Sequence, residues 1–247
     1  MKTNRMYGEY AHLWPLISDP EEYTEEAGYW RDALREFLGP GRHHVLELGV
    51  GGGHNLSHLT AEFEATAVDM SAEMLAHSEK LNGSVEHHLG DMRTVRLGRR
   101  FDAVLIHDAI GYMTTETDLL AAFVTAREHL KPGGVLVTAP DYYVETFDGP
   151  YVSNNTRKAG SVELTYVEYD TDPDPHDSTI DTVFVYFLTE DGKFRVELDR
   201  HVTGLFTIDT WQRLLGEAGF VTQRRPYPVT EDPRSDFLWV GVCQNVG

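Results

Sequence analysis

A glycine-rich loop is the part of this sequence that points most directly to chemistry. Residues 47–53 read ELGVGGG and follow an apolar run that is typical of a buried strand. Because glycine lacks a Cβ atom, Gly49, Gly51 and Gly53 allow a tight turn with positive φ and leave room for a bulky ligand. The helix expected after the loop offers unpaired N–H groups to a negatively charged part of that ligand. The loop therefore predicts a nucleotide-type binding site at the end of a strand.

The spacing of these glycines separates two classes of nucleotide-binding protein. The dinucleotide fingerprint G-x-G-x-x-G needs a third glycine, which lets the helix pack closely on the strand. The sixth position is His54 when counted from Gly49 and Leu56 when counted from Gly51, so neither frame supplies that glycine. The loop has the form E-x-G-x-G-x-G instead. An NAD-type oxidoreductase is therefore a less favoured alternative.

The loop and the segments after it resemble, in order, the motifs of class I S-adenosylmethionine (SAM)-dependent methyltransferases. The loop motif is VLELGVGGG at residues 45–53. It is followed by AVDMS at residues 67–71, GDMR at residues 90–93, FDAVLIHDAIGYM at residues 101–113 and LKPGGVLV at residues 130–137. The ordered set implies that SAM is the methyl donor and S-adenosylhomocysteine the product. A protein that binds SAM without catalysis is an alternative that these motifs leave open.

The resemblance assigns contacts with SAM to particular side chains. It implies that Asp69 accepts hydrogen bonds from both ribose hydroxyls, which a carboxylate can do. It also implies that Asp91 accepts from the adenine amino group, that Met92 packs on the ring, and that Glu47 lies beside the positively charged amino-acid end. As alternatives, Asp69 and Asp91 are solvated acids at strand ends and Glu47 anchors N–H groups of the loop. The expected cofactor contacts are Tyr23, Glu47, Gly49, Gly51, Gly53, Asn55, Asp69, Met70, Asp91, Met92 and His107.

An alternation of predicted strands and helices must hold these residues in place. Residues 20–39 are predicted to form a helix, because acidic residues fill its first turns and glycine and proline end it. From residue 44 to residue 140, apolar strands alternate with helices, and Ser71 is the expected start of one of them. Such an alternation requires a mostly parallel sheet with helices on both faces. The expected fold is α/β and Rossmann-like, with the seven-stranded sheet that the resemblance implies.

The pattern changes after Pro140. Three β-rich runs, at residues 161–169, 178–189 and 193–206, predict an antiparallel sheet, and a helix that begins near Thr207 leads into two last strands. We expect a single methyltransferase domain over residues 1–247. Its parts are N-terminal lid helices (1–40), a SAM-binding core (41–150), an antiparallel β insertion that covers the acceptor site (151–205), and the last helix and strands of the core (206–247).

The resemblance extends beyond the cofactor motifs and bears on the methyl acceptor. Residues 108–123, 139–147 and 200–220, with the β-rich insertion, are similar to small-molecule N-methyltransferases that dimethylate nucleotide-linked amino sugars in antibiotic pathways. The chain departs from those enzymes at His107-Asp108-Ala109, where they tend to have small hydroxyl residues, and at Asp141-Tyr142-Tyr143, where they have paired tryptophans. Both departures touch the expected acceptor pocket. An amine of a small molecule is therefore the expected acceptor, and a small-molecule O-methyltransferase is the alternative.

Candidate catalytic and substrate residues follow from the chemistry of methyl transfer. The displacement at a sulfonium carbon mainly needs orientation of the acceptor and exclusion of water. An oxygen acceptor also needs a general base, and His107 at a strand end is the best placed, with His201 behind it. Tyr112 is the third catalytic candidate, and aromatic rings near it could bind a cationic amine through their faces. The candidate substrate contacts are Tyr10, Trp14, Tyr112, Tyr142 and Tyr143, and core packing is the alternative for each of them.

The composition limits the partners of the protein. A formal net charge of −19 would repel a phosphate backbone, so nucleic acid is not expected as a substrate. No apolar run approaches the roughly 18 residues that cross a bilayer, and the first residues show neither a signal peptide nor an anchor. We therefore expect a cytoplasmic enzyme without a membrane partner. A homodimer is implied only by analogy with the related sugar enzymes.

No metal site is expected. His54 and His58 stand one helical turn apart but lack the glutamate of H-E-x-x-H. A single cysteine, Cys243, excludes an intramolecular disulfide and a cysteine-based zinc site. The acidic run at residues 168–177 contains prolines and lacks the turn glycine of a calcium loop, so we interpret it as a solvated turn.

Overall fold

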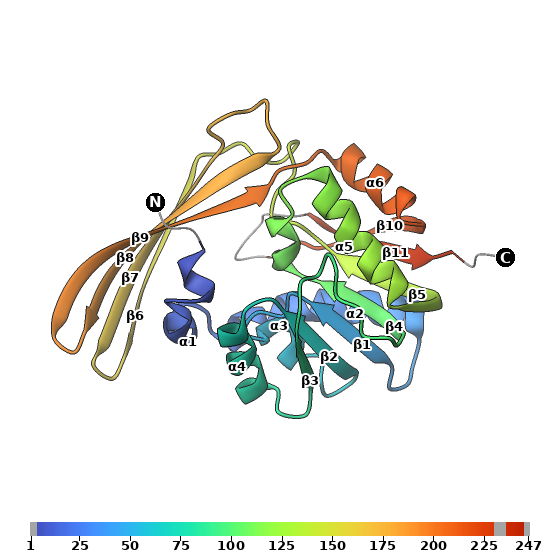
Figure 1. Cartoon of the computed structure of the whole chain (residues 1–247), viewed down its shortest axis with the longest axis horizontal. Coiled ribbons are helices and arrows are strands. Elements are labelled where there is room, and N and C mark those ends of the chain that lie inside the picture. Colours follow the sequence, from blue (N-terminus) through green and yellow to red (C-terminus); the bar gives the residue numbers. More distant parts are fainter. Residues whose placement is uncertain (1–3, 230–235, 245–247) are drawn as a thin grey trace.

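The computed structural model describes residues 4–229 and 236–244 and contains two sheets (Figure 1). The larger sheet has seven strands in the order β10-β11-β5-β4-β1-β2-β3. Its strands are β1 (His44–Leu48), β2 (Glu64–Asp69), β3 (Glu86–Leu89), β4 (Phe101–Ile106), β5 (Leu130–Thr138), β10 (Phe220–Pro226) and β11 (Phe237–Cys243). The pairs from β3 to β5 are parallel, and β11 runs antiparallel to both of its neighbours. The predicted α/β, Rossmann-like sheet is confirmed.

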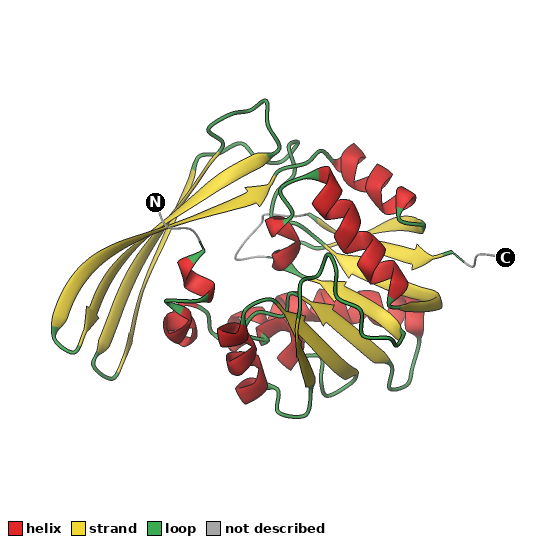
Figure 2. Cartoon of the chain, in the orientation of Figure 1, coloured by secondary structure: helices red, strands yellow, loops and turns green. Residues whose placement is uncertain are grey.

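Helices cover both faces of this sheet (Figure 2). They are α2 (Thr24–Leu38), α3 (His54–Ser57), α4 (Ala72–Leu81), α5 (Glu116–Glu128) and α6 (Ile208–Glu217). Side chains alternate along β1, so Val45 packs in one core cluster with α2 while Leu46 packs in the other with α5 and α6. Three of these helices, α4, α5 and α6, begin where a hydroxyl side chain accepts a backbone N–H group, at Ser71, Thr115 and Thr207. Two of these starts, at Ser71 and Thr207, were predicted.

The helix after the glycine loop is shorter than the sequence pattern predicts. Apolar spacing favours a helix over residues 54–63, but α3 ends at Ser57 and turns follow it. The Ser57 hydroxyl donates to the carbonyl of His54, and the Thr60 hydroxyl donates to that of Ser57. Such side-chain bonds compete with the regular backbone ladder and account for the early end.

The smaller sheet has four antiparallel strands and projects from one side of the core (Figure 1). Its strands are β6 (Tyr151–Ala159), β7 (Val162–Thr171), β8 (Thr179–Glu190) and β9 (Lys193–Gly204), paired in that order. Three of them match the predicted β-rich runs. The sequence pattern missed β6, because it is an edge strand of mostly exposed polar residues and lacks an apolar alternation.

The N-terminal segment lies between the two sheets. It consists of the short helices η1 (Arg5–Tyr7), η2 (Ala11–Leu13), α1 (Trp14–Ile17) and η3 (Pro20–Tyr23). Met6, Tyr10 and Leu13 pack against Leu188 and its neighbours on the inner face of the smaller sheet. Asp199 of β9 also accepts the backbone N–H of Met6 at 2.8 Å. Among the described residues, no helix is long and apolar enough to cross a membrane.

Candidate functional site

A cavity of about 660 Å³ opens at the carboxyl ends of the parallel strands. The segments that follow β1, β2, β3 and β4 line it, at residues 49–52, 69–71, 90–93 and 107–109. The N-terminal segment contributes the opposite wall. The sequence-predicted residues in its lining are Trp14, Tyr23, Glu47, Gly49, Gly51, Asn55, Asp69, Met70, Asp91, Met92, His107 and Tyr112. The structure thus brings most of the expected cofactor contacts to one place.

The glycines of the loop have different tasks. Gly49 has a φ of 78°, and a Cβ built on it would lie 2.3 Å from the Cβ of Ala109, so glycine is what lets the ends of β1 and β4 meet. Gly51 also has positive φ, and its N–H donates to the cavity acid Asp69. Gly53 does not appear in the cavity lining. Its carbonyl accepts from Asn82, the residue after α4, at 2.9 Å, and a Cβ on Gly53 would lie 2.3 Å from the hydroxyl of Ser78.

Asp69 anchors the loop and faces the cavity. One of its carboxylate oxygens accepts from the N–H of Gly51 and the other from the N–H of Ser71, both at 2.8 Å. Burial raises the pKa of Asp69, although these N–H groups act in the opposite direction. Each oxygen keeps a second lone pair for a ligand hydroxyl. The sequence left open that Glu47 anchors N–H groups of the glycine loop. In the structure Asp69 accepts such an N–H group, from Gly51.

The carboxylate of Asp91 is engaged by a neighbour. The Arg93 guanidinium donates to both of its oxygens at 2.6–3.0 Å and also reaches Asp118 at 3.0 Å. These hydrogen bonds lower the pKa of Asp91 against the effect of burial, so the group is ionised. An ionised carboxylate at this edge can accept from an exocyclic amine. Met70, 72% exposed, and the nearly buried Met92 lie on the same part of the lining.

Among the described residues, two side chains of the cavity that are themselves buried have polar atoms without a protein partner. They are Glu47, through Oε2, and Asn55, through both its amide nitrogen and its oxygen. Burial raises the pKa of Glu47 to about 8. An unpaired buried polar atom costs roughly 1–3 kcal/mol, so these atoms are suited to a ligand that supplies hydrogen-bond partners. The amino-acid end of SAM carries an ammonium and a carboxylate, which match a carboxyl and an amide. The residues present therefore fit this cofactor.

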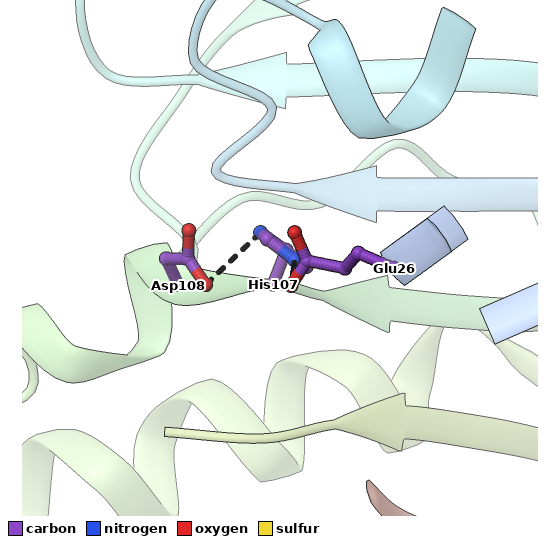
Figure 3. A group of neighbouring side chains, drawn as sticks. All are labelled: Glu26, His107 and Asp108. Atoms are coloured by element: carbon purple, nitrogen blue, oxygen red, sulfur yellow. Dashed lines mark hydrogen bonds and ion pairs between the residues drawn. The ribbon is translucent and has the colours of Figure 1, made fainter. Parts of the chain in front are cut away.

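His107 is held between two carboxylates (Figure 3). Its Nε2 lies 2.7 Å from Oε1 of Glu26, and its Nδ1 lies 3.1 Å from Oδ1 of Asp108. Burial alone would lower the pKa of His107, but the two carboxylates outweigh that effect and raise it well above its ordinary value. The imidazole is therefore protonated at neutral pH, with both N–H groups donated. A ring that donates both of its N–H groups has no lone pair with which to abstract a proton.

A second cavity of about 140 Å³ adjoins the first and shares Tyr7, Asp108 and Tyr112 with it. Its far wall is the inner face of the smaller sheet. Four carboxylates and one imidazole are among its lining groups, and these are Asp108, Asp141, Glu168, Asp170 and His201. The wall between the two cavities is thus aromatic, and the smaller cavity is acidic.

A chain of hydrogen bonds runs from this shared wall into the protein. The hydroxyls of Tyr7 and Tyr112 are 2.9 Å apart, and Nδ1 of His201 lies 2.5 Å from the Tyr112 hydroxyl. On its other side, Nε2 of His201 lies 3.0 Å from the fully buried Asp199. Burial would raise the pKa of Asp199, but its hydrogen bonds with His201 and the backbone lower it. Asp199 therefore accepts a hydrogen bond from the Nε2–H of His201, and Nδ1 faces the hydroxyl of Tyr112, which donates to Tyr7.

Of three other aromatic residues predicted to contact the substrate, one lines a cavity and two pack in the protein interior. Tyr142 lines the small cavity, where its hydroxyl is 3.3 Å from Asp170. Tyr143 is fully buried and stacks on Phe237 at 5.2 Å between ring centroids. Tyr10 is also buried, with its ring 5.7 Å from that of Tyr186. For Tyr10 and Tyr143 the structure therefore shows core packing.

Several residues of the site were not singled out from the sequence. They are Tyr7, Glu26 and Asp199, while Asp108 and Asp141 were noted only as departures near the acceptor pocket. Glu168 and Asp170 belong to the run interpreted as a solvated turn; that interpretation is wrong for them, because both lie on β7 and line the small cavity. Asp199 stands two residues before His201 on one strand, so the period of two would have placed both on the same face. Glu26 meets His107 across 81 residues of sequence, and no local pattern reports such a contact.

Comparison with known proteins gives a consistent result. Residues 45–134 match the family model described as "Methyltransferase domain". The chain is 39% identical over 135 residues to dTDP-3-amino-3,4,6-trideoxy-alpha-D-glucopyranose N,N-dimethyltransferase of Streptomyces venezuelae, a match that covers 54% of this chain and 56% of that one. It is 29% identical to dTDP-3-amino-3,6-dideoxy-alpha-D-glucopyranose N,N-dimethyltransferase of Streptomyces fradiae, over 89% of this chain and 86% of that one.

Solved structures agree with the sequence matches. The crystal structure of Streptomyces venezuelae DesVI superimposes with a TM-score of 0.80 at 28% identity, over 95% of this chain and 96% of that one. Together these matches confirm the resemblance seen in the motifs. The chain contains a SAM-dependent methyltransferase domain, and the NAD-type alternative is set aside.

The carboxyl group of Glu47 should change its protonation state when SAM binds. Below pH of about 8 its carboxyl carries a proton in the free protein, and a nearby ligand ammonium favours the ionised form. SAM binding at pH 7 should therefore release a proton from Glu47, and SAM affinity should rise with pH up to about 8. Titration calorimetry in two buffers with different ionisation enthalpies measures this release.

Glu47→Gln should lose this proton release and should bind SAM at least about tenfold more weakly. The matched control is Glu79→Gln, on the exposed face of α4, which should behave like the wild type. Equal proton release in wild type and Glu47→Gln would contradict the assignment.

Proposed function

We propose that this SAM-dependent methyltransferase transfers methyl groups to the amine of a small molecule, an amino sugar joined to a nucleotide. The observation that carries the proposal is the acidic cavity beside the cofactor cavity. A cavity lined by Asp108, Asp141, Glu168 and Asp170 attracts an ammonium group and opposes a negatively charged acceptor atom. The names of the two Streptomyces relatives support a sugar amine as that acceptor.

The hydrogen-bond chain gives the amine a route for its proton. SAM supplies the electrophilic methyl group when it is bound, and the acceptor needs only a free lone pair. An ammonium N–H near the shared wall can donate to the Tyr112 oxygen while Tyr112 passes its own proton to Nδ1 of His201. The imidazolium that forms is stabilised by the buried carboxylate of Asp199. Tyr112 and His201 are therefore the proposed catalytic residues.

An oxygen acceptor with His107 as its base is disfavoured. Glu26 and Asp108 keep His107 protonated, and both of its nitrogens are already engaged. We assign His107 a positioning task instead: it ties α2, through Glu26, to the end of β4 beside the cofactor cavity. Its positive charge also offsets part of the negative charge there.

Trp14 and Tyr23 of the N-terminal segment line the cofactor cavity with the glycine loop, and Trp14 stacks on His54 at 5.6 Å, so residues 4–23 act as a lid. The remainder of the predicted lid, α2, packs on the seven-stranded sheet instead. The insertion of residues 151–205 covers the acceptor and supplies one wall of its cavity. The acceptor is a small molecule and not nucleic acid. We further propose a cytoplasmic homodimer.

The proposed function is tested by release of S-adenosylhomocysteine. Purified protein and SAM are incubated with a dTDP-linked amino sugar or with the matched sugar that has a hydroxyl in place of the amine. We expect product release only with the amine. Binding of SAM without release on either sugar, or on a panel of simpler amines, would favour a non-catalytic SAM-binding protein.

The proton route predicts a pH-dependent defect. Tyr112→Phe should lower kcat/KM about 100-fold at pH 7, where the amine is protonated, and much less at high pH, where the amine is already neutral. His201→Asn should behave in the same way. Tyr142 lines the same cavity but lies outside the chain of hydrogen bonds, so Tyr142→Phe is the matched control. A loss in Tyr112→Phe that is equal at every pH would exclude proton transfer through this hydroxyl.

The positioning task of His107 predicts a different result. His107→Gln removes a charged hydrogen-bonding partner from Glu26 and should lower the free energy of unfolding by about 2 kcal/mol. The shape of its pH–rate profile should match that of the wild type, because the ring is not the base. Denaturant unfolding and initial rates measure the two effects. Disappearance of the rising limb of the profile in this variant would restore His107 as a base.

A further inference from the structure

The two cavities share one wall, and the reacting atoms have to meet there. In the proposed function SAM occupies the larger cavity and the acceptor amine occupies the smaller one. Among the described residues, only Tyr7, Asp108 and Tyr112 line both cavities. Burial raises the pKa of both tyrosines, so their hydroxyls are neutral near pH 7. Of these three residues, Asp108 is therefore the one that carries a charge.

Asp108 presents its carboxylate to both cavities. It is the first residue of the short helix η4 (Asp108–Tyr112), and 56% of its side chain is exposed. Its Oδ1 lies 3.1 Å from Nδ1 of His107, on the side of the ring away from Glu26 (Figure 3). Its charge also reaches the N-terminal segment, because it adds to the effect of burial in raising the pKa of Tyr7 and of Tyr23. An anionic group thus faces the place where the acceptor nitrogen must lie.

A buried array of hydrogen bonds holds Asp108 in this position. Oε1 of Glu26 accepts from Nε2–H of His107 at 2.7 Å and also from the hydroxyl of Tyr227. Trp30 donates its indole N–H to the same hydroxyl at 3.2 Å, and its ring centroid lies 4.9 Å from that of His107. Trp30, His107 and Tyr227 are at most 6% exposed. The array therefore joins α2, the residue after β10 and the end of β4, and it ends at a carboxylate that faces the shared wall.

The charges that change during methyl transfer give this carboxylate a task. The acceptor arrives as an ammonium ion and gives up one proton to Tyr112. An N–C bond then forms from the nitrogen lone pair, while the bond from sulfur to the methyl carbon breaks and leaves its electron pair on sulfur. One positive charge therefore moves from sulfur to nitrogen. The nitrogen is cationic on arrival and again after the transfer, and a preorganised anion beside it stabilises both states.

We propose that Asp108 binds the acceptor ammonium and places its nitrogen where the two cavities meet, with Glu26 and His107 as positioning residues. The inference rests on the proposed function and adds the class of amine that the site takes. That class is an aliphatic or sugar amine, which is an ammonium ion at neutral pH, and not an aromatic amine or an amide, whose nitrogen is neutral there. Asp141 and the other acids of the smaller cavity do not line the larger one, so they add to the negative charge without reaching the reacting atoms.

Binding of the acceptor without turnover tests the proposal. Protein loaded with S-adenosylhomocysteine is titrated in a calorimeter with the dTDP-linked amino sugar and with the matched sugar that has a hydroxyl in place of the amine. The wild type should prefer the amine. Asp108→Asn should weaken binding of the amine by about 10- to 100-fold, the contribution of a hydrogen bond to a charged group, and leave binding of the hydroxyl sugar unchanged. Asp108→Glu, which keeps the charge, should retain part of the preference.

The controls separate Asp108 from other acids of the chain. Glu163→Gln, on β7 and outside both cavities, should bind both sugars as the wild type does. A preference for the amine that survives in Asp108→Asn, or that is lost in Asp141→Asn alone, would overturn the assignment. Equal binding of the two sugars by the wild type would also overturn it. The proposed function itself fails only if the wild type releases no S-adenosylhomocysteine with the amine, so the two failures are distinct.

A double-variant cycle tests the positioning task of Glu26. Glu26→Gln removes the charge that holds His107 and should weaken binding of the amine about tenfold, with binding of the hydroxyl sugar unchanged. The same substitution made in Asp108→Asn should have no further effect, because both act through one carboxylate. Glu25→Gln, at the exposed neighbouring position on α2, is the matched control, and thermal unfolding shows whether each variant is folded. Additive losses from the two substitutions would overturn the positioning task.

Discussion

Close packing of two strand ends is the constraint on which the site depends. β1 and β4 are neighbours in the sheet, and Gly49 meets Ala109 so closely that no side chain fits between them. This contact brings the loop after β1 beside the segment that carries Asp108 and Tyr112. Those two residues line both cavities, so the place of the acceptor relative to the cofactor follows from it.

Electrostatics divides the site into parts with different partners. Asp69 and Asp91 receive N–H groups from the backbone or from Arg93, so they stay in place and keep acceptor capacity. Glu47 lacks such a partner at one oxygen and is held neutral by burial until a cation arrives. The small cavity is lined by four carboxylates, and this charge favours an amine that arrives as an ammonium and leaves its proton to Tyr112 and His201.

Local sequence patterns account for much of the fold and for most of the cofactor site. The alternation of strands and helices, the start of α4 at Ser71 and the acids at the ends of β2 and β3 all depend on short stretches of sequence, so they could be predicted. β6 could not, because a polar edge strand has no apolar period. The charge state of His107 could not be predicted either, since it depends on Glu26 from a distant helix. Tyr10 and Tyr143 show the same limit, because an aromatic residue near a site can equally pack in the core.

The central claim is that nitrogen receives the methyl group. The most direct measurement uses SAM labelled with ¹³C in its methyl group and a dTDP-linked amino sugar that offers both an amine and free hydroxyls. NMR of the isolated product then locates the label. The account predicts ¹³C signals of methyl groups bonded to nitrogen and none of methyl groups bonded to oxygen. Label found on a hydroxyl oxygen would contradict it.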